Sequence, residues 1–172
     1  DHVRMVKSLD RILENNNLRV KTIINTHCHV DHINGNKFFY DKYGCRILTS
    51  EGECHFVAYP DREPKFYYSG INTDKTRNPF FITQACGAEI ITPDNTPDGF
   101  EVISLPGHSF DMIGVRTPDD VVFLADSILS KKTWDEYKLP FFYDVNASLW
   151  TLKDIQTIKA KLFIPAHDEP IE

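Results

Sequence analysis

The sequence predicts a mixed α/β fold, because short segments rich in β-branched residues alternate with segments of helical period. Residues 20–24 (VKTII) and 45–49 (CRILT) have the composition of strands, and residues 36–43 between them are expected to form a helix. Histidines and carboxylates follow several of these strands directly. With 172 residues and 41% apolar content, the chain suits one globular domain over residues 1–172.

The N-terminal half begins with a predicted helix over residues 3–13, where apolar side chains recur at helical spacing and three asparagines follow. Residues 59–86 show no clear period, so we expect a long connection there. Its aromatic side chains either pack a lid onto the core or line a substrate pocket, and the sequence leaves both interpretations open. They include Phe66, Tyr67, Tyr68, Phe80 and Phe81.

The C-terminal half is predicted to contain short strands and one helix. The helix covers residues 146–159, where apolar residues recur at helical spacing, and Asn146 is its expected N-cap. Residues 117–120 (TPDD) join two of the strands into a hairpin. The predicted strands are residues 88–91, 101–105, 113–116, 121–124 and 162–164.

The composition restricts the classes of molecule that this protein is expected to bind. A formal net charge of -6 disfavours nucleic acid, whose phosphates require clustered Lys and Arg. No apolar run approaches the roughly 20 residues that cross a bilayer, so we expect a soluble, cytoplasmic protein without a membrane partner that acts on a small-molecule substrate. The four cysteines are scattered and form no C-x-x-C pair. Cys28 should point away from its histidine neighbours and pack as a small apolar side chain.

Potential metal ligands gather at the ends of four predicted strands. Residues 27–32 (HCHVDH) contain three imidazoles and a carboxylate, and His108, Asp126 and His167 each follow a later strand. In an extended segment His27 and His29 can face one ion, whereas Asp31 and His32 lie beyond the bend and can face a second. The spacing therefore favours two metal ions, and imidazole with carboxylate suits zinc, iron or manganese.

These segments resemble the metallo-β-lactamase superfamily: THCHVDH at residues 26–32, PGHS at 106–109, FLADS at 123–127 and IPAHDE at 164–169 occur in the family's order. The resemblance covers nearly the whole chain and implies an αββα sandwich. It implies two divalent metal ions, with zinc as the first expectation. The first ion would be bound by His27, His29 and His108, the second by Asp31, His32 and His167, and Asp126 would bridge both.

The resemblance implies a hydrolase that uses a metal-bound hydroxide, which Asp31 would help to orient. The aspartate at position 126 favours the glyoxalase II-like branch, so a thioester, lactone or related ester is the expected substrate. True β-lactamases generally lack this aspartate, and the acidic composition counts against the nuclease branch. Glutathione thioesters are doubtful, because the helical extension that binds glutathione in glyoxalase II has no counterpart after His167. The alternatives are an oxidoreductase like the persulfide dioxygenases, which hold one iron, and a non-catalytic metal-binding domain.

Only 26 residues precede His27, whereas members of this superfamily carry several strands before the helix that leads to the histidines. We therefore expect the sequence to lack N-terminal strands of the sandwich. The sheet that holds residues 20–24 would then expose an apolar face and open edges. A missing N-terminal segment or a homo-oligomer would cover that sheet.

Overall fold

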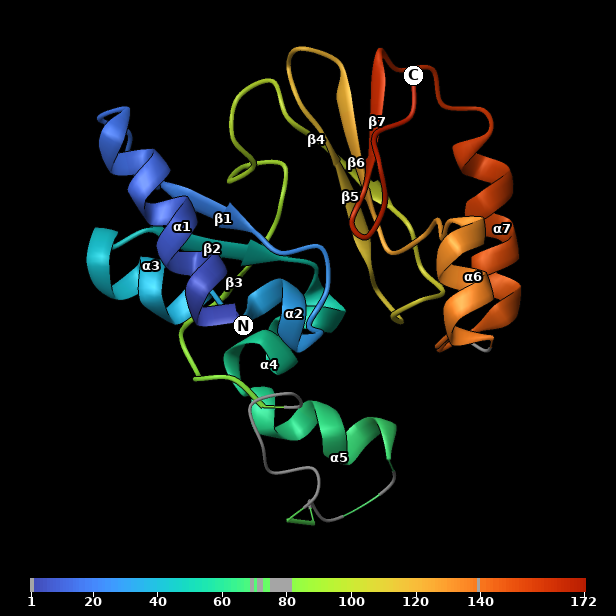
Figure 1. The fold of residues 1–172 in the computed structure, drawn as a ribbon, viewed down its shortest axis with the longest axis horizontal. Coiled ribbons are helices and arrows are strands. Elements are labelled where there is room, and N and C mark those ends of the chain that lie inside the picture. Colours follow the sequence, from blue (N-terminus) through green and yellow to red (C-terminus); the bar gives the residue numbers. More distant parts are fainter. Residues whose placement is uncertain (1, 69, 71–72, 75–81, 139) are drawn as a thin grey trace. The chain divides into compact units, whose positions relative to one another are not determined.

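A computed structural model describes residues 2–68, 70, 73–74, 82–138 and 140–172. The chain forms two compact units, Asp1–Ile90 and Ile91–Glu172, here called unit 1 and unit 2. Each unit contains one sheet and its own helices (Figure 1). Phe80 and Phe81 of the predicted aromatic connection lie outside the described residues. The prediction of a single domain stays a prediction.

Unit 1 contains a parallel three-stranded sheet in the order β1-β2-β3. The strands are β1 (Thr22–Ile24), β2 (Arg46–Thr49) and β3 (Glu89–Ile90). Ile23 pairs with Ile47 in register, and Ile47 is 2% exposed in a core cluster with Cys28, Ile33 and Val57. Helices occupy the connections: α1 (His2–Asn15), α2 (Val30–Ile33), α3 (Asn36–Tyr43), α4 (Glu51–Ala58), the 3₁₀ turn η1 (Pro60–Arg62) and α5 (Glu63–Tyr67).

Helix α1 is attached to α3 by a small polar network. Lys42 Nζ donates to both carboxylate oxygens of Asp10, at 2.7 and 2.6 Å, and to Glu14 at 2.6 Å. Tyr43 adds a 2.8 Å hydrogen bond from its hydroxyl to Asp10. The lysine ammonium lowers the pKa of the Asp10 carboxyl below its usual value, so this attachment persists at neutral pH.

Unit 2 contains a four-stranded sheet in the order β4-β5-β6-β7. Strands β4 and β5 are antiparallel, as are β5 and β6, whereas β6 and β7 are parallel. Strands β4, β6 and β7 therefore run in the same direction, and their carboxyl ends lie at the same end of the sheet. The strands are β4 (Glu101–Ser104), β5 (Ile113–Arg116), β6 (Val121–Ala125) and β7 (Leu162–Pro165).

One face of this sheet packs against α7 (Val145–Ile155), and the connection before that helix contains α6 (Lys131–Tyr137) (Figure 1). Val122 and Leu124 of β6 are fully buried and contact Ile155 of α7 in the core cluster. Alternate residues of β6 point to opposite faces, so Val122 and Leu124 share the helix-covered face while Phe123 points away and is 42% exposed.

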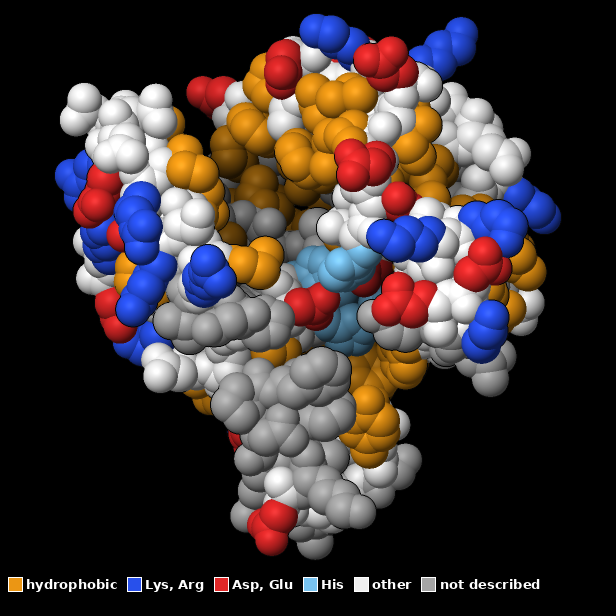
Figure 2. Space-filling model, in the orientation of Figure 1, with side chains coloured by type: hydrophobic (Ala, Val, Ile, Leu, Met, Phe, Trp, Pro, Cys, Tyr) orange, Lys and Arg blue, Asp and Glu red, His pale blue; other side chains and the backbone are white. Residues whose placement is uncertain are grey.

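On that opposite face Phe123 belongs to an apolar row that crosses all four strands, because Val102 pairs with Val115, Val115 with Phe123, and Phe123 with Ile164. Hydrophobic side chains gather over these strands in Figure 2. In unit 1, within the described residues, β1 and β3 each pair with β2 alone. The expectation that another segment or chain covers a sheet stays a prediction.

The structure differs from the helix predictions in several places. Helices α2, α4 and α6 were not predicted, since none of these segments shows a strong helical period in the sequence. The predicted connection of residues 59–86 contains the short helices η1 and α5. The predicted N-cap Asn146 is wrong: it lies inside α7, and Asp144 caps that helix by accepting a 3.0 Å hydrogen bond from Ala147 N. Among the helices in the described parts of the chain, none is long and apolar enough to span a bilayer.

Candidate metal centre

The histidine motif begins just after the carboxyl end of β1 and continues into α2, within unit 1. His27 Nε2 and His29 Nδ1 are 3.0 Å apart, so the two rings direct one nitrogen each toward a common point. The other ring nitrogen of His27 is 3.1 Å from the Thr26 hydroxyl. On α2, His32 Nε2 lies 3.4 Å from a carboxylate oxygen of Asp31. Unit 1 therefore brings together all four predicted ligands of this motif.

Buried polar side chains hold this loop in shape. Asn25 and Asn36 exchange hydrogen bonds through their amide groups, at 2.8 and 3.3 Å, and the Asn25 amide also reaches the His32 carbonyl at 3.4 Å. Glu53 of α4 is 0% exposed and accepts a 3.0 Å hydrogen bond from Cys28 N, between the first two histidines. Both contacts fix the backbone on which the imidazoles stand, which reduces the conformational entropy lost on binding a ligand.

Cys28 was predicted to pack as a small apolar side chain, and it is 1% exposed in the unit 1 core. Burial, followed by the nearby Glu53 carboxylate, raises the pKa of its thiol. The thiolate is the form of cysteine that binds metals and attacks electrophiles. Cys28 is therefore a packing residue.

Helix α5 supplies two further side chains beside His29. Glu63 Oε1 is 3.9 Å from His29 Nε2, and the Tyr67 ring centroid is 5.6 Å from that of His29. Glu63 is 9% exposed. Its burial, followed by the charges of Glu53 and Asp31, raises the pKa of this carboxyl to about 7.

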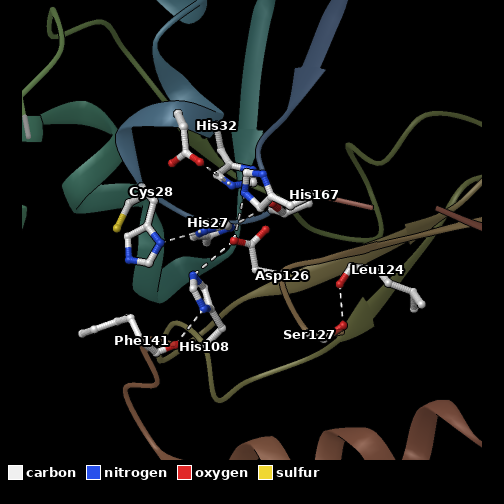
Figure 3. A network of polar contacts seen from close by, with 12 residues as sticks. His27, Cys28, His32, His108, Leu124, Asp126, Ser127, Phe141 and His167 are labelled. Atoms are coloured by element: carbon white, nitrogen blue, oxygen red, sulfur yellow. Dashed lines mark hydrogen bonds and ion pairs between the residues drawn. The ribbon is translucent and has the colours of Figure 1, made fainter. Parts of the chain in front are cut away.

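The carboxyl ends of β4, β6 and β7 bring together the three predicted ligands of unit 2. Asp126 follows β6 and is 6% exposed. Its Oδ2 atom lies 3.4 Å from His108 Nε2 and 3.3 Å from His167 Nε2, so one carboxylate oxygen stands between two imidazoles. Figure 3 shows the side chains of His108, Asp126 and His167 lying close together.

The tautomer of His108 follows from its second contact. His108 Nδ1 lies 3.1 Å from the Phe141 carbonyl oxygen (Figure 3). A carbonyl oxygen only accepts hydrogen bonds, so Nδ1 must carry a proton. In the neutral ring Nε2 then presents its lone pair toward the Asp126 carboxylate, which is unfavourable unless a cation stands between them. The pair is therefore suited to share a metal ion or, without one, a proton on His108.

The loop that carries His108 is fastened to the start of α7. The Gly107 carbonyl accepts hydrogen bonds from Tyr143 N at 2.9 Å and Asp144 N at 3.0 Å. Thr151 Oγ1 donates to the Pro106 carbonyl at 2.7 Å. Gly107 has φ +134°, and a Cβ placed there would lie 2.4 Å from Ser148 N, so only glycine permits this approach.

An irregularity at the end of β6 sets the direction of the Asp126 side chain. The pairing of β6 with β7 shifts between Phe123 and Ala125, and Ala125 has a positive φ of 51°. Beyond the shift Ala166 N donates to the Ala125 carbonyl at 3.0 Å, which links the residues preceding Asp126 and His167. Bulges of this kind often redirect a side chain next to a functional site.

Neither Glu53 nor Glu63 was predicted from the sequence. An isolated glutamate usually lies in solvent. The available signal for Glu53 was its position shortly after a predicted strand, and the sequence carried none for Glu63. The seven predicted ligands form two groups, four in unit 1 and three in unit 2. All are imidazoles and carboxylates, the donor types that divalent zinc, iron and manganese accept.

Known solved structures share this fold. BLEG-1, described as a B3 metallo-beta-lactamase, aligns with a TM-score of 0.69 and 18% identity over 96% of this chain and 78% of that one. TTHA1623, solved in a di-iron-bound form, gives a TM-score of 0.70 and 18% identity with the same coverage. The predicted fold class is thereby confirmed.

Two curated relatives match in sequence. A hydroxyacylglutathione hydrolase from Pelagibacter ubique (strain HTCC1062) is 40% identical over 47 residues, which are 27% of this chain and 20% of that protein. A Beta-lactamase-like protein 2 homolog from Drosophila melanogaster is 24% identical over 100% of this chain and 53% of that protein. The chain thus matches a fifth of the first relative and about half of the second.

The family model of the metallo-beta-lactamase superfamily matches residues 5–167, from α1 to the last predicted ligand. The matched region contains both groups of histidines and carboxylates. The chain therefore belongs to the metallo-beta-lactamase superfamily.

Proposed function

We propose that this chain is a metal-dependent hydrolase that acts on a thioester, lactone or related ester. The observation that supports it most is Asp126 Oδ2, placed 3.4 and 3.3 Å from the Nε2 atoms of His108 and His167. A carboxylate between two imidazoles is the arrangement expected of a ligand that two metal ions share. The family to which the chain belongs supports the same chemistry.

In this proposal seven residues hold two divalent metal ions, zinc being the first candidate. His27, His29 and His108 would hold one ion, Asp31, His32 and His167 would hold the other, and Asp126 would be a ligand of both, as the family resemblance implies. When bound, such ions lower the pKa of water toward neutrality and stabilise negative charge on the oxygen or sulfur of the substrate.

The side chains of the proposed site have different roles. Asp126 is buried, so its charge is little screened by solvent and stays fixed between the histidines. Asp31 is more exposed, with 44% of its side chain accessible, and can orient the attacking hydroxide. The Phe141 carbonyl fixes the proton of His108 on Nδ1 and so keeps Nε2 available as a ligand.

Support for the substrate class comes from the hydroxyacylglutathione hydrolase that is 40% identical over 47 residues. The presence of Asp126 points to the same branch. Tyr67, which lies beside His29, is an aromatic side chain available to contact an acyl group. The identity of the metal ions and the class of substrate are both parts of this proposal.

A second candidate is a mononuclear iron oxidoreductase. Unit 2 alone assembles two histidines and one aspartate, the donor combination of many non-haem iron oxygenases. TTHA1623, a structural neighbour, was solved with two irons. Metal content and oxygen uptake separate this candidate from the hydrolase.

The test is a screen of thioesters, lactones and phosphodiesters, with metal content measured on the same sample purified without added metal. We expect thioester or lactone hydrolysis, loss of that activity after chelation, and its recovery with zinc, iron or manganese. One iron per chain with oxygen consumption and no hydrolysis would favour the oxidoreductase. Hydrolysis that survives complete metal removal would contradict the proposal.

A further inference from the structure

We propose that Glu63 is a positioning residue for His29: its buried carboxylate lies beside Nε2 of the ring, favours the tautomer that carries the proton on that atom, and so presents Nδ1 to the metal ion. This inference rests on the proposed function, because it takes His29 as a ligand. Glu63 itself lies outside the seven predicted ligands.

The His29 ring has distinct partners on its two nitrogens. Its Nδ1 is 3.0 Å from His27 Nε2, on the side where the two imidazoles converge. Its Nε2 is 3.9 Å from Glu63 Oε1, within ion-pair distance. An imidazole that gives the Nδ1 lone pair to a metal carries its proton on Nε2. That proton faces Glu63.

Helix α5 is built to hold this carboxylate in place. Glu63 and Tyr67 are four residues apart and so lie on one face of the helix. The Tyr67 ring centroid is 5.6 Å from that of His29, so the helix contacts the imidazole with both an acid and an aromatic ring. Two contacts from one helix restrict the rotation of the His29 ring as well as its tautomer.

The burial of Glu63 argues against a role in fold stability alone. A carboxylate that is 9% exposed loses much of its hydration, which costs free energy unless a cation or several donors compensate. Glu53 differs, because it accepts a backbone hydrogen bond from Cys28 N and thereby fixes the loop. Glu63 faces an imidazole that gains positive character when it binds a metal, which supplies the compensation.

The experiment measures zinc affinity by competition with a chromophoric chelator for the wild type, Glu63→Gln, Glu63→Asp and Glu51→Gln. Glu51 is an exposed acid at the start of α4 and serves as the matched control. We expect Glu63→Gln to weaken zinc binding by about 10- to 100-fold, the usual effect of removing such a partner. Glu63→Asp, which keeps the charge, should retain part of the affinity, and Glu51→Gln should match the wild type.

The melting temperature of the metal-free protein separates positioning from a structural role. Because glutamine removes a buried charge, metal-free Glu63→Gln should unfold at or above the wild-type temperature. Wild-type zinc affinity in Glu63→Gln would overturn this inference while leaving the proposed function intact. A large fall in its metal-free melting temperature would assign Glu63 to the fold and overturn the inference as well. Failure of the wild type to bind zinc, iron or manganese would overturn both.

Discussion

Asp126→Asn should lower the rate of ester or thioester hydrolysis by at least about 100-fold, more than the loss usual for a residue that acts only through a ligand. Asparagine has the same shape, so the packing beside β6 is preserved. It lacks the negative charge, and its amide group cannot replace a carboxylate as a shared metal ligand. In the wild type, Asp126 Oδ2 lies 3.4 Å from His108 Nε2 and 3.3 Å from His167 Nε2. Steady-state kinetics at saturating zinc measures the effect.

Asp135→Asn is the matched control for that variant. Asp135 lies on α6 in the same unit, is 62% exposed in its side chain and pairs with Lys131. Its replacement should leave turnover unchanged, and circular dichroism should show both variants folded. If Asp126→Asn kept wild-type turnover at saturating zinc, a shared carboxylate would be unnecessary and the mechanism would be mononuclear or independent of metal.

Gly107→Ala should destabilise unit 2 by about 2 kcal/mol or more and reduce activity at the same time. The added Cβ would lie 2.3, 2.4 and 2.5 Å from Oγ, N and Cα of Ser148. Two of these atoms are backbone, so α7 must shift relative to the loop that carries His108. Differential scanning calorimetry should show a fall in melting temperature of roughly 10 °C.

Two further variants isolate the cause of that loss. Ser148→Gly in the Gly107→Ala background removes the Oγ contact but neither backbone contact, so the double variant should stay destabilised. Gly87→Ala is the control, because a Cβ there meets nothing within 4 Å. Its melting temperature should stay close to that of the wild type. An unchanged melting temperature in Gly107→Ala would refute the close approach of the loop to α7.

The predictable parts of the fold were those set by local sequence. The helix at residues 36–43 and the β5–β6 hairpin were predicted at their observed positions because apolar period and turn residues determine them. Helix α4 has glycine and cysteine among its residues and a weak period, so its formation depends on the packing of Val57 into the core. The N-cap of α7 was misplaced by two residues, since Asp144 and Asn146 are both good capping residues.

The seven candidate ligands could be named from the sequence because five histidines and two aspartates follow strand ends in a recognisable order. The side chains that support them could not. Glu53 and Glu63 differ in no local feature from exposed glutamates, and only the packing of α4 and α5 against the histidine loop makes them buried. The Phe141 carbonyl that fixes the His108 tautomer is a backbone group and carries no signal in the sequence.

We propose that the seven candidate ligands bind two metal ions, and a zinc titration of the chelator-stripped protein tests this proposal most directly. We expect two tightly bound zinc ions per chain. We also expect fewer zinc ions in His27→Ala, a variant of unit 1, and in His167→Ala, a variant of unit 2. The absence of tight zinc binding, or a stoichiometry that neither replacement changes, would contradict it.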